Sequence, residues 1–477
     1  MTSSPPAIDF SKKWYVLSAV GMGVFLATID GSIVNISLPT LVSSFQTDFA
    51  LVQWVVLAYL LTVTTLMLGI GRLADIYGKK PIYTAGFIVF TVGSVLCGLS
   101  PTIYTLIGFR ILQGIGAAMV MALGMAIVTE AFPPSERGRA LGITGTIVSV
   151  GITLGPTLGG LIVKNLSWNW IFFVNLPVGF IGTFMVVRYV PAFKPAGGQR
   201  FDYWGALTLC ISLLSLLVAL TLGQRVGFGD GTVLLLVGMF VVFLASFIFI
   251  ELRAEQPMLD LRLFRNSLFS VSLTTGFIIF ICLSGTLILM PFYAQNVLGY
   301  DPQQTGLLMA TVPLALGVIA PLSGSLSDRF GSRPIMVAGL AVLTVGFLAI
   351  SSLDAETTTL GYVLRFLPMG LGMGMFQSPN NSAIMGSAPR DRLGIASGML
   401  AVTRTLGQTT GIAVLGALWA GQVFKHAGIV IAGGATAAPI AAQVFALRDT
   451  FVIVSILIFI ALLLSIWGLR EERKLKK

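Results

Sequence analysis

The chain has 477 residues, of which 56% are hydrophobic and 10% are charged, whereas a soluble domain carries roughly 25% charged residues. This composition excludes a water-soluble globular protein. The net charge of +10 does not indicate nucleic-acid binding, because the basic residues lie in short gaps between apolar runs.

A transmembrane helix needs about 20 mainly apolar residues. Fourteen runs of this kind follow one another: 14–38, 50–71, 81–99, 102–126, 139–163, 168–190, 203–222, 232–251, 268–290, 304–325, 335–352, 358–385, 393–420 and 449–469. The first run follows Lys12 and Lys13 without a small-residue cleavage pattern, so it is predicted to be a span rather than a removed signal peptide. The sequence therefore predicts an all-α polytopic membrane protein with fourteen transmembrane helices.

The basic residues indicate which side each gap faces, because cytoplasmic gaps carry the excess of Lys and Arg. We number the gaps between successive spans from the N-terminus. The termini and the even-numbered gaps hold 22 of the 29 Lys and Arg residues, and the odd-numbered gaps hold four. Both termini are therefore predicted to be cytoplasmic. The remaining three, Arg110, Arg365 and Arg404, fall inside predicted spans.

The two ends of the sequence repeat each other. Residues 71–81 match residues 324–334 at Gly, Leu, Asp, Gly and Pro, an offset of 253 residues, and Glu136-Arg137 matches Asp391-Arg392 at an offset of 255. The repeat predicts two pseudo-symmetric six-helix bundles with two inserted helices between them. The predicted parts are a tail 1–13, a bundle 14–190, a linker with two extra helices 191–267, a bundle 268–469 and a basic tail 470–477.

Two six-helix halves around a central substrate site are a transporter architecture. On its repeated loop the chain resembles the major facilitator superfamily, and its two extra central spans resemble the fourteen-helix drug:proton antiporter branch of that family. The resemblance implies a multidrug efflux transporter that works by alternating access. Short loops and tails suggest the bacterial cytoplasmic membrane.

Asp30 is the only one of the 19 acidic residues that lies well inside a span. The string from Ile29 to Pro39, which includes Asn35, resembles the span-one signature of the fourteen-helix branch. A carboxylate that alternates between dry and wet surroundings can take up and release a proton. Asp30 is therefore the predicted proton carrier, and a static ion pair is the alternative.

The loop between spans two and three is the clearest family signature. In isolation it reads as a capped, positively charged cytoplasmic turn, but its repeat and its likeness to the superfamily loop imply a charge network that latches one conformation. The residues of this predicted latch are Gly71, Asp75, Gly78, Lys79, Lys80, Asp328 and Arg333.

Arg110 lies about eight residues below the outer end of span four, at a depth similar to that of Asp30. Intramembrane charges usually face a cavity or a partner. The string from Arg110 to Ala117, which includes Gln113, is similar to the span-four signature of the family, whose Arg is associated with proton transfer. The alternative is a structural Arg bonded to backbone carbonyls.

Span five carries glycines four residues apart on one helix face, with a proline between them. Close helix packing explains these glycines, but the string also resembles the antiporter signature, which favours export. Its residues are Gly151, Gly155, Pro156, Gly159 and Gly160.

Arg404 lies about eleven residues into span thirteen, close to the midplane. Asp30 is expected to interact with Arg110 through the cavity, and the second hypothesis is a lock between Asp30 and Arg404 that breaks on protonation. A carboxylate or phosphate of the substrate is the alternative partner of Arg404. Other candidates for the cavity or for ion pairs are Arg365, Gln377 and Asn380.

No enzyme is predicted, because one His and three separated Cys provide no metal or triad framework. The sequence lacks a nucleotide-binding loop, so no cofactor is expected and a proton gradient drives transport. The expected partners are a small amphipathic substrate, protons and membrane lipid, with the chain a monomer. An exporter of a lipid or anionic metabolite, and a non-transporting sensor, are the alternatives. The outer gap 421–447 is expected to be a solvated loop with some amphipathic helix, and a lid or a lipid-facing extension is the minor alternative.

Overall fold

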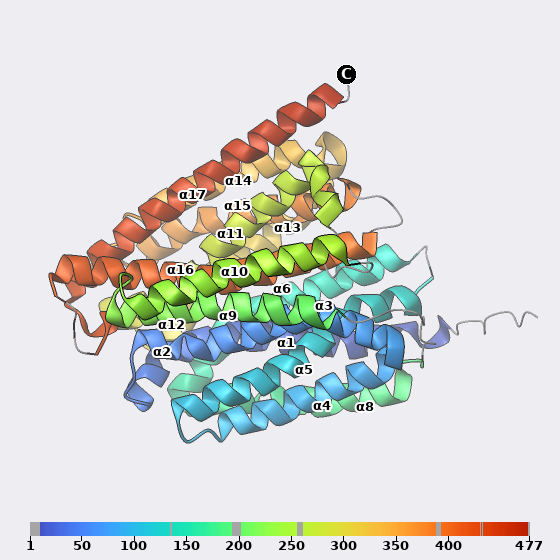
Figure 1. Cartoon of the computed structure of the whole chain (residues 1–477), viewed down its shortest axis with the longest axis horizontal. Helices are drawn as coiled ribbons and strands as arrows, with labels where there is room; N and C mark the ends of the chain where they lie inside the picture. The colour runs from blue at the N-terminus through green and yellow to red at the C-terminus, as the bar shows by residue number, and fades with distance from the viewer. Residues whose placement is uncertain are drawn as a thin grey trace, which may run out of the picture.

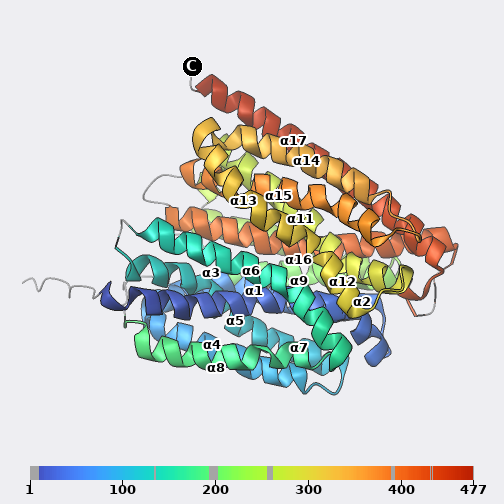
Figure 2. The ribbon, with the colours of Figure 1, turned by 180° about the vertical axis from the view of Figure 1, so that it is seen from behind.

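The computed structural model describes residues 10–133, 136–192, 202–254, 261–387, 393–429, 431 and 433–475. Over these residues the chain forms long helices that run side by side through one bundle (Figure 1). α1 begins and α17 ends at the same end of this bundle (Figures 1 and 2).

The first half of the chain supplies one group of packed helices. They are α1 (Lys13–Ser44), α2 (Phe49–Val52), α3 (Trp54–Tyr77), α4 (Lys79–Gly98), α5 (Ile103–Ala131), α6 (Arg137–Asn165), α7 (Trp170–Phe173) and α8 (Asn175–Tyr189). Within the group, α1 packs on α5, α6 and α8, and α5 packs on α3 and α4.

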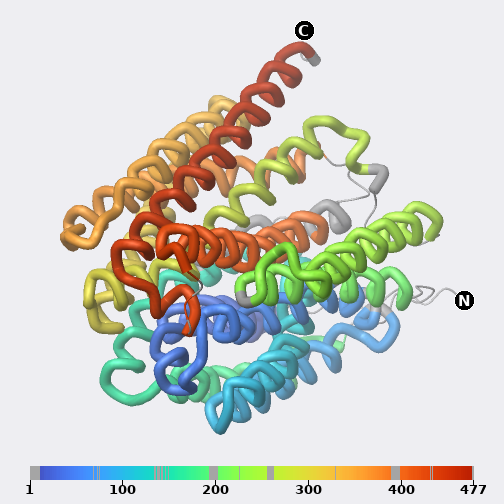
Figure 3. Tube along the Cα trace, turned by 60° about the vertical axis from the view of Figure 1, so that its left-hand side comes forward, coloured from blue at the N-terminus to red at the C-terminus, as the bar shows by residue number. Residues whose placement is uncertain are grey.

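The last part of the chain forms a second group. It contains α11 (Ser267–Phe292), α12 (Pro302–Met309), α13 (Thr311–Phe330), α14 (Ser332–Ile350), α15 (Thr359–Ser387), α16 (Leu393–Ala427) and α17 (Ile440–Leu475). Between the groups come α9 (Tyr203–Val226) and α10 (Gly231–Arg253). α9 packs against α3 and α16, and α10 packs on α9 (Figure 3).

Eleven helices of the described residues are long and apolar enough to cross a membrane. The short α2, α7 and α12 each continue into the next helix, so each pair corresponds to one predicted span. The other three predicted spans, 139–163, 358–385 and 393–420, are occupied by α6, α15 and α16, which have 29, 29 and 35 residues. The all-helical membrane fold is confirmed, and the count of fourteen spans and the cytoplasmic termini remain predictions.

The predicted outer gap 421–447 is largely helical. α16 continues to Ala427 and α17 begins at Ile440, which leaves only a short connection with one 3₁₀ turn at Ala435–Ala437.

The repeated loop has the same backbone in both halves. Gly78 joins α3 to α4 with φ 95° and ψ 146°, and Gly331, 253 residues later, joins α13 to α14 with φ 86° and ψ 153°. This conformation is essentially restricted to glycine. The glycine at each junction therefore allows two long helices to reverse direction without a loop.

The two groups of helices touch at the end of the bundle remote from the termini. There, an added Cβ on Gly160 of α6 would lie 2.3 Å from the Pro302 oxygen of α12, and one on Gly306 of α12 would lie 2.3 Å from the Pro156 oxygen. The rings of Phe49 and Phe292 meet at the same end, with centroids 5.0 Å apart. Towards the termini α14 and α17 of the second group point away from the first group (Figures 1 and 2), whereas α16 packs on α3.

Candidate functional site

Six polar or aromatic side chains from five helices converge inside the first group. Each is at most 3% exposed. They are Asp30 of α1, Tyr59 of α3, Ser94 of α4, Arg110 and Gln113 of α5, and Asn175 of α8. We call this set the Asp30 cluster.

An ion pair lies at the centre of the Asp30 cluster. Arg110 Nη1 donates to Asp30 Oδ2 at 2.5 Å and to Gln113 Oε1 at 2.6 Å. Arg110 Nε donates to the Val55 carbonyl at 2.8 Å, and its guanidinium lies 4.2 Å from the centre of the Tyr59 ring. Both charged side chains are fully buried, so the charge of each depends on the other.

The second carboxylate oxygen is held by amides. Asp30 Oδ1 accepts from Gln113 Nε2 at 2.8 Å and from Asn175 Nδ2 at 3.0 Å. Gln113 Nε2 also donates to Ser94 Oγ at 2.8 Å. The carboxylate of Asp30 therefore accepts hydrogen bonds from three side chains of α5 and α8.

The glycines of α6 bring that helix against the segment of α1 that carries Asp30. Added Cβ atoms on Gly151, Gly155 and Gly159 would lie 2.2, 1.8 and 2.6 Å from atoms of Thr28, Ser32 and Ile36. Ser32 Oγ donates to the Gly151 carbonyl at 3.2 Å. Because Gly160 and Pro156 contact α12, the same helix touches the Asp30 helix on one side and the second group on the other.

The residues of the predicted latch form bonds within each half. Lys79 pairs with Glu130 of α5, and Lys80 Nζ donates to the Val187 carbonyl of α8 at 2.8 Å. Arg333 Nε lies 3.0 Å from Glu472 Oε2 of α17. Nothing lies within 4 Å of an added Cβ on Gly71, and the side chains of Asp75 and Asp328 lie outside the described part of the structure.

Arg404 lies in the second group and stacks 5.5 Å from the centre of the Phe280 ring of α11. The bonds of Asp30 described above all come from the first group, so the pairing observed is with Arg110 and not with Arg404. Arg365 Nε donates to Ser352 Oγ at 2.9 Å, and its Nη1 donates to the Gly361 carbonyl at 3.0 Å.

The remaining amides lie apart from the Asp30 cluster. Asn35 is buried on α1 and donates to the Gly31 carbonyl at 3.3 Å. Asn380 is buried on α15, and its Oδ1 has no partner among the described residues. Gln377, on the same helix, is partly exposed.

Sequence reasoning did not identify Asn175, Ser94 or Tyr59. Asn175 leaves a signal, because an amide inside the apolar run 168–190 needs a partner. Ser94 leaves none, since Ser hydroxyl groups in membrane helices often bond their own backbone. Tyr59 leaves none either, because membrane proteins carry many aromatic side chains for packing and interface anchoring.

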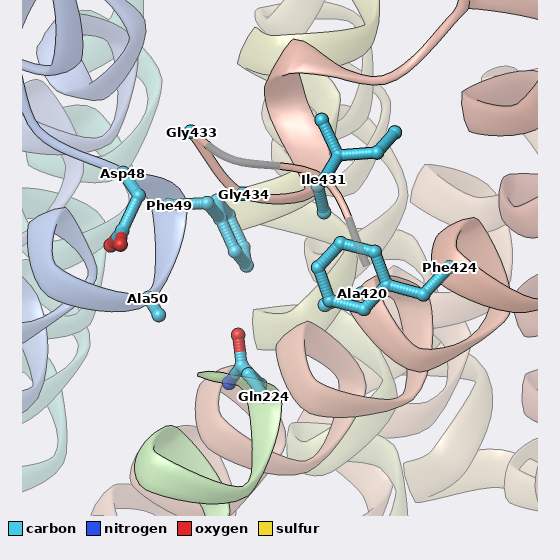
Figure 4. Close-up of a pocket in the computed structure, with 10 residues that line it drawn as sticks. Asp48, Phe49, Ala50, Gln224, Ala420, Phe424, Ile431, Gly433 and Gly434 are labelled. Atoms are coloured by element: carbon cyan, nitrogen blue, oxygen red, sulfur yellow. The ribbon is translucent and has the colours of Figure 1, made fainter. Parts of the chain in front are cut away.

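A separate cavity of about 140 Å³ lies at the end remote from the termini, between α2, α9, α16 and the segment 431–435 (Figure 4). Gln224 points into it, and Phe49 and Phe424 form its walls. Gln53 Nε2 donates to Gln224 Oε1 at 3.4 Å behind this wall. The cavity is too small for a drug-sized molecule.

The described residues contain no group of three or more His, Cys, Asp and Glu side chains able to hold a metal ion. The buried Cys97 lies beside the Asp30 cluster, with its Sγ 3.7 Å from Gln113 Oε1, and is unpaired.

Comparison with known proteins identifies relatives along the whole chain. The family model described as Major Facilitator Superfamily matches residues 20–412 and 273–477. "Riboflavin transporter RibZ" of Clostridioides difficile is 34% identical over 471 residues, covering 97% of this chain and 99% of the relative. "Multidrug resistance protein Stp" of Mycobacterium tuberculosis is 36% identical and "Multidrug transporter protein MdtP" of Bacillus subtilis 31% identical, covering 85% and 86% of this chain and 75% of each relative.

Solved structures share the fold at low sequence identity. An auto-inhibited POT family peptide transporter matches with a TM-score of 0.67 and 15% identity, covering 97% of this chain and 96% of its own. A bacterial homologue of the human lysosomal transporter Spinster, in an inward-facing and occupied conformation, matches with a TM-score of 0.65 and 18% identity, covering 98% of both chains.

Proposed function

The chain belongs to the major facilitator superfamily, and on that premise we propose that it is a proton-coupled exporter of hydrophobic or amphipathic organic compounds. As a member of this family it is a transporter of small molecules, not an enzyme, and a multi-pass protein of the bacterial cytoplasmic membrane. Its relatives named for multidrug resistance support export of organic compounds.

The observation that carries the proposal is the fully buried ion pair between Asp30 and Arg110. Neutralising one member of such a pair leaves the other as an unpaired buried charge, which costs about 3–5 kcal/mol. Proton binding to Asp30 would therefore disfavour this conformation and favour one in which water reaches Arg110. A proton that binds in one state and leaves in another couples its gradient to the conformational change.

The packing of α6 offers a route from the Asp30 cluster to the seam between the halves. Its glycines touch α1 beside Asp30, while Gly160 and Pro156 touch α12. A shift of α1 on protonation would press on α6 and so on the contact with α12. With cytoplasmic termini, as the basic residues predict, the contact lies on the outer side, and the structure would represent the state closed to the outside.

The other predicted roles follow from this cycle. Lys79, Lys80 and Arg333 would stabilise each half at the cytoplasmic end while the halves move as bodies. No cofactor is required, because the gradient supplies the work. The halves 14–190 and 268–469 would be the moving bodies, with the linker 191–267 packed across them through α9.

The test is gradient-driven flux in proteoliposomes with an imposed pH difference. Wild type is compared with Asp30→Asn, for a lipophilic monocation, a neutral dye and an anionic dye. Asp230→Asn is the matched control, because Asp230 is an exposed N-cap whose side chain bonds the Thr232 amide, and Asn also caps helices well. Flux driven by the gradient in wild type and in Asp230→Asn, and lost in Asp30→Asn, supports the proposal; unchanged flux in Asp30→Asn refutes the proton-carrier role. Absence of flux for every probe would favour the non-transporting sensor.

A further inference from the structure

Arg404 differs from the two buried arginines, Arg110 and Arg333, in having no acidic partner among the described residues. Arg110 is fully buried with Asp30, and Arg333 lies beside Glu472. Arg404 makes a contact with the Phe280 ring, and no carboxylate of the described residues pairs with it. Part of its surface is nevertheless exposed, although it lies over the middle of α11.

The neighbourhood of Arg404 is built by close helix packing. An added Cβ on Gly407 would lie 2.8 Å from Phe280 Cβ, and one on Gly411 would lie 2.2 Å from the Ile281 carbonyl oxygen. These two glycines therefore bring α16 onto α11 directly beyond Arg404 and fix the Phe280 ring beneath the guanidinium. Gln408, one helical turn after Arg404, is also partly exposed on the same side of α16.

The helix that carries Arg404 also borders the first half of the chain. α16 packs against α3 of the first group and against the inserted α9, as well as against α11 and α17. α16 therefore lies along the seam between the two halves. The Asp30 cluster, in contrast, is enclosed within the first group, so proton binding and contact with Arg404 take place in different halves.

A guanidinium remains charged in proteins and presents a planar set of donors that matches a carboxylate or phosphate. An unpaired charge at this depth in a membrane is unfavourable, and such groups usually face a cavity or a ligand. Asp30 is already satisfied by Arg110, so the missing counter-ion has to come from outside the described side chains. A planar aromatic anion would fit best, since it could bond the fork and stack beside Phe280.

We propose that Arg404 binds the anionic group of the exported compound, so that the substrates of this transporter include amphipathic organic anions carrying a carboxylate, sulfonate or phosphate. The proposal rests on the proposed export function and specifies its substrate class. It makes the C-terminal half the place where the charge of the substrate is recognised, and the N-terminal half the place where the proton is carried.

The test uses two probes that differ only in charge, a diethylaminocoumarin carboxylate and its neutral carboxamide, with tetraphenylphosphonium as the cation. Flux is measured in proteoliposomes under a pH difference for wild type, Arg404→Gln and Arg404→Lys. Arg253→Gln is the matched control, because Arg253 also stacks on a phenylalanine, with its guanidinium 4.2 Å from the centre of the Phe249 ring, but is exposed on α10.

We expect Arg404→Gln to lower kcat/KM for the carboxylate by about ten- to a hundredfold, mainly by raising KM. This factor corresponds to the loss of one hydrogen bond to a charged group. The carboxamide should be unaffected, Arg404→Lys should restore part of the carboxylate flux, and Arg253→Gln should behave as wild type. Equal losses for carboxylate and carboxamide would assign Arg404 a structural role and overturn the inference. So would unchanged carboxylate flux in Arg404→Gln.

Two further outcomes separate this inference from the export function. If wild type exports the carboxamide or the cation but not the carboxylate, export stands and the anion inference is overturned. If no probe is moved, export is refuted, and binding of the carboxylate to purified protein, followed by coumarin fluorescence, decides the inference alone. A lipid headgroup as the true ligand would appear as displacement of the carboxylate by phosphatidylglycerol and as flip of that lipid, lost in Arg404→Gln.

Discussion

Neutralising Asp30 alone should destabilise the protein more than removing both charges of the buried pair. Asp30→Asn keeps the size of the side chain but leaves Arg110 charged at 0% exposure. Breaking a buried pair in this way costs about 3–5 kcal/mol. In the double variant Asp30→Asn with Arg110→Gln no uncompensated charge remains, and the loss is limited to about one or two hydrogen bonds at about 1 kcal/mol each.

The expected signature is therefore a coupling free energy of at least about 2 kcal/mol between the two substitutions. Variants purified in a Cys210→Ala background, which removes the partly exposed thiol, can be compared by thermal unfolding with a thiol-reactive fluorogenic dye. The remaining thiols are buried, and Cys97 lies beside the Asp30 cluster. The single variant Asp30→Asn should unfold at a lower temperature than the double variant. Strictly additive losses, or an Asp30→Asn variant as stable as wild type, would refute the reasoning.

The same energy explains why protonation of Asp30 would favour another conformation. A proton on the carboxylate has the same effect on the Arg110 environment as Asp30→Asn. If the single variant is destabilised in this state but transports without coupling, the ion pair is the coupling device. If it is destabilised and does not transport, the pair is also required to hold the fold.

Three further outcomes follow from the packing. Gly155→Val should separate α6 from α1, because even a Cβ would lie 1.8 Å from Ser32 Oγ and 2.7 Å from Ser32 Cβ. We expect a cost of about 1–3 kcal/mol, with a drop in unfolding temperature and flux. Gly78→Ala, at φ 95°, should cost about 1–3 kcal/mol in the same unfolding assay, while Gly108→Ala, where an added Cβ meets nothing within 4 Å, is the control for both and should cost nothing. The backbone amide of Gln304, and then Lys164, lower the pKa of Asp301, which pairs with Lys164 across the two halves at 2.9 Å. This stabilisation, about 0–1 kcal/mol because the pair is exposed, is present above the ordinary carboxyl pKa of about 4 and is lost as pH falls through the lowered value. Spin labels across the seam should therefore report no opening between pH 7 and 5. In Asp301→Asn, which lacks the carboxylate at every pH, the distance between the labels should not change when the pH is lowered further.

The depth of the charged residues could be predicted from the sequence, but their direction around the helix axis could not. Counting residues placed Asp30 and Arg110 at similar levels, and they do meet. The same counting left Arg404 open as a partner of Asp30, whereas Arg404 stacks on Phe280. Which of two residues at one level faces a third depends on how the helices are rotated, and only the packed bundle determines this.

The positions of the helices could be predicted because a membrane-spanning helix needs a long apolar run. The residues at which the helices end could be predicted less well. α16 and α17 extend into the gap 421–447, since a run of apolar residues shows that a span is present but does not show at which residue its helix begins or ends. The junctions at Gly78 and Gly331 were visible as a repeat, and the backbone explains the repeat by a conformation that only glycine adopts easily. Asn175 was missed because a single amide in an apolar run says nothing about which carboxylate it will reach.

If the proton is carried in one half and the substrate charge is bound in the other, both charges move in each transport cycle. The voltage dependence of transport then depends on the charge of the substrate. Each elementary charge moved across 100 mV corresponds to about 2.3 kcal/mol. Export of a monoanion in exchange for one proton moves two positive charges inward, so an inside-negative potential of 100 mV contributes about 4.6 kcal/mol per cycle. A neutral compound moves one charge, and a monocation moves none. If Arg404 selects anions, carboxylate export should increase steeply when a potassium diffusion potential is imposed at constant pH, carboxamide export should increase less, and tetraphenylphosphonium export should not respond. Equal responses for the three probes would contradict a single proton carried on Asp30, because the charge moved per cycle would then not depend on the substrate.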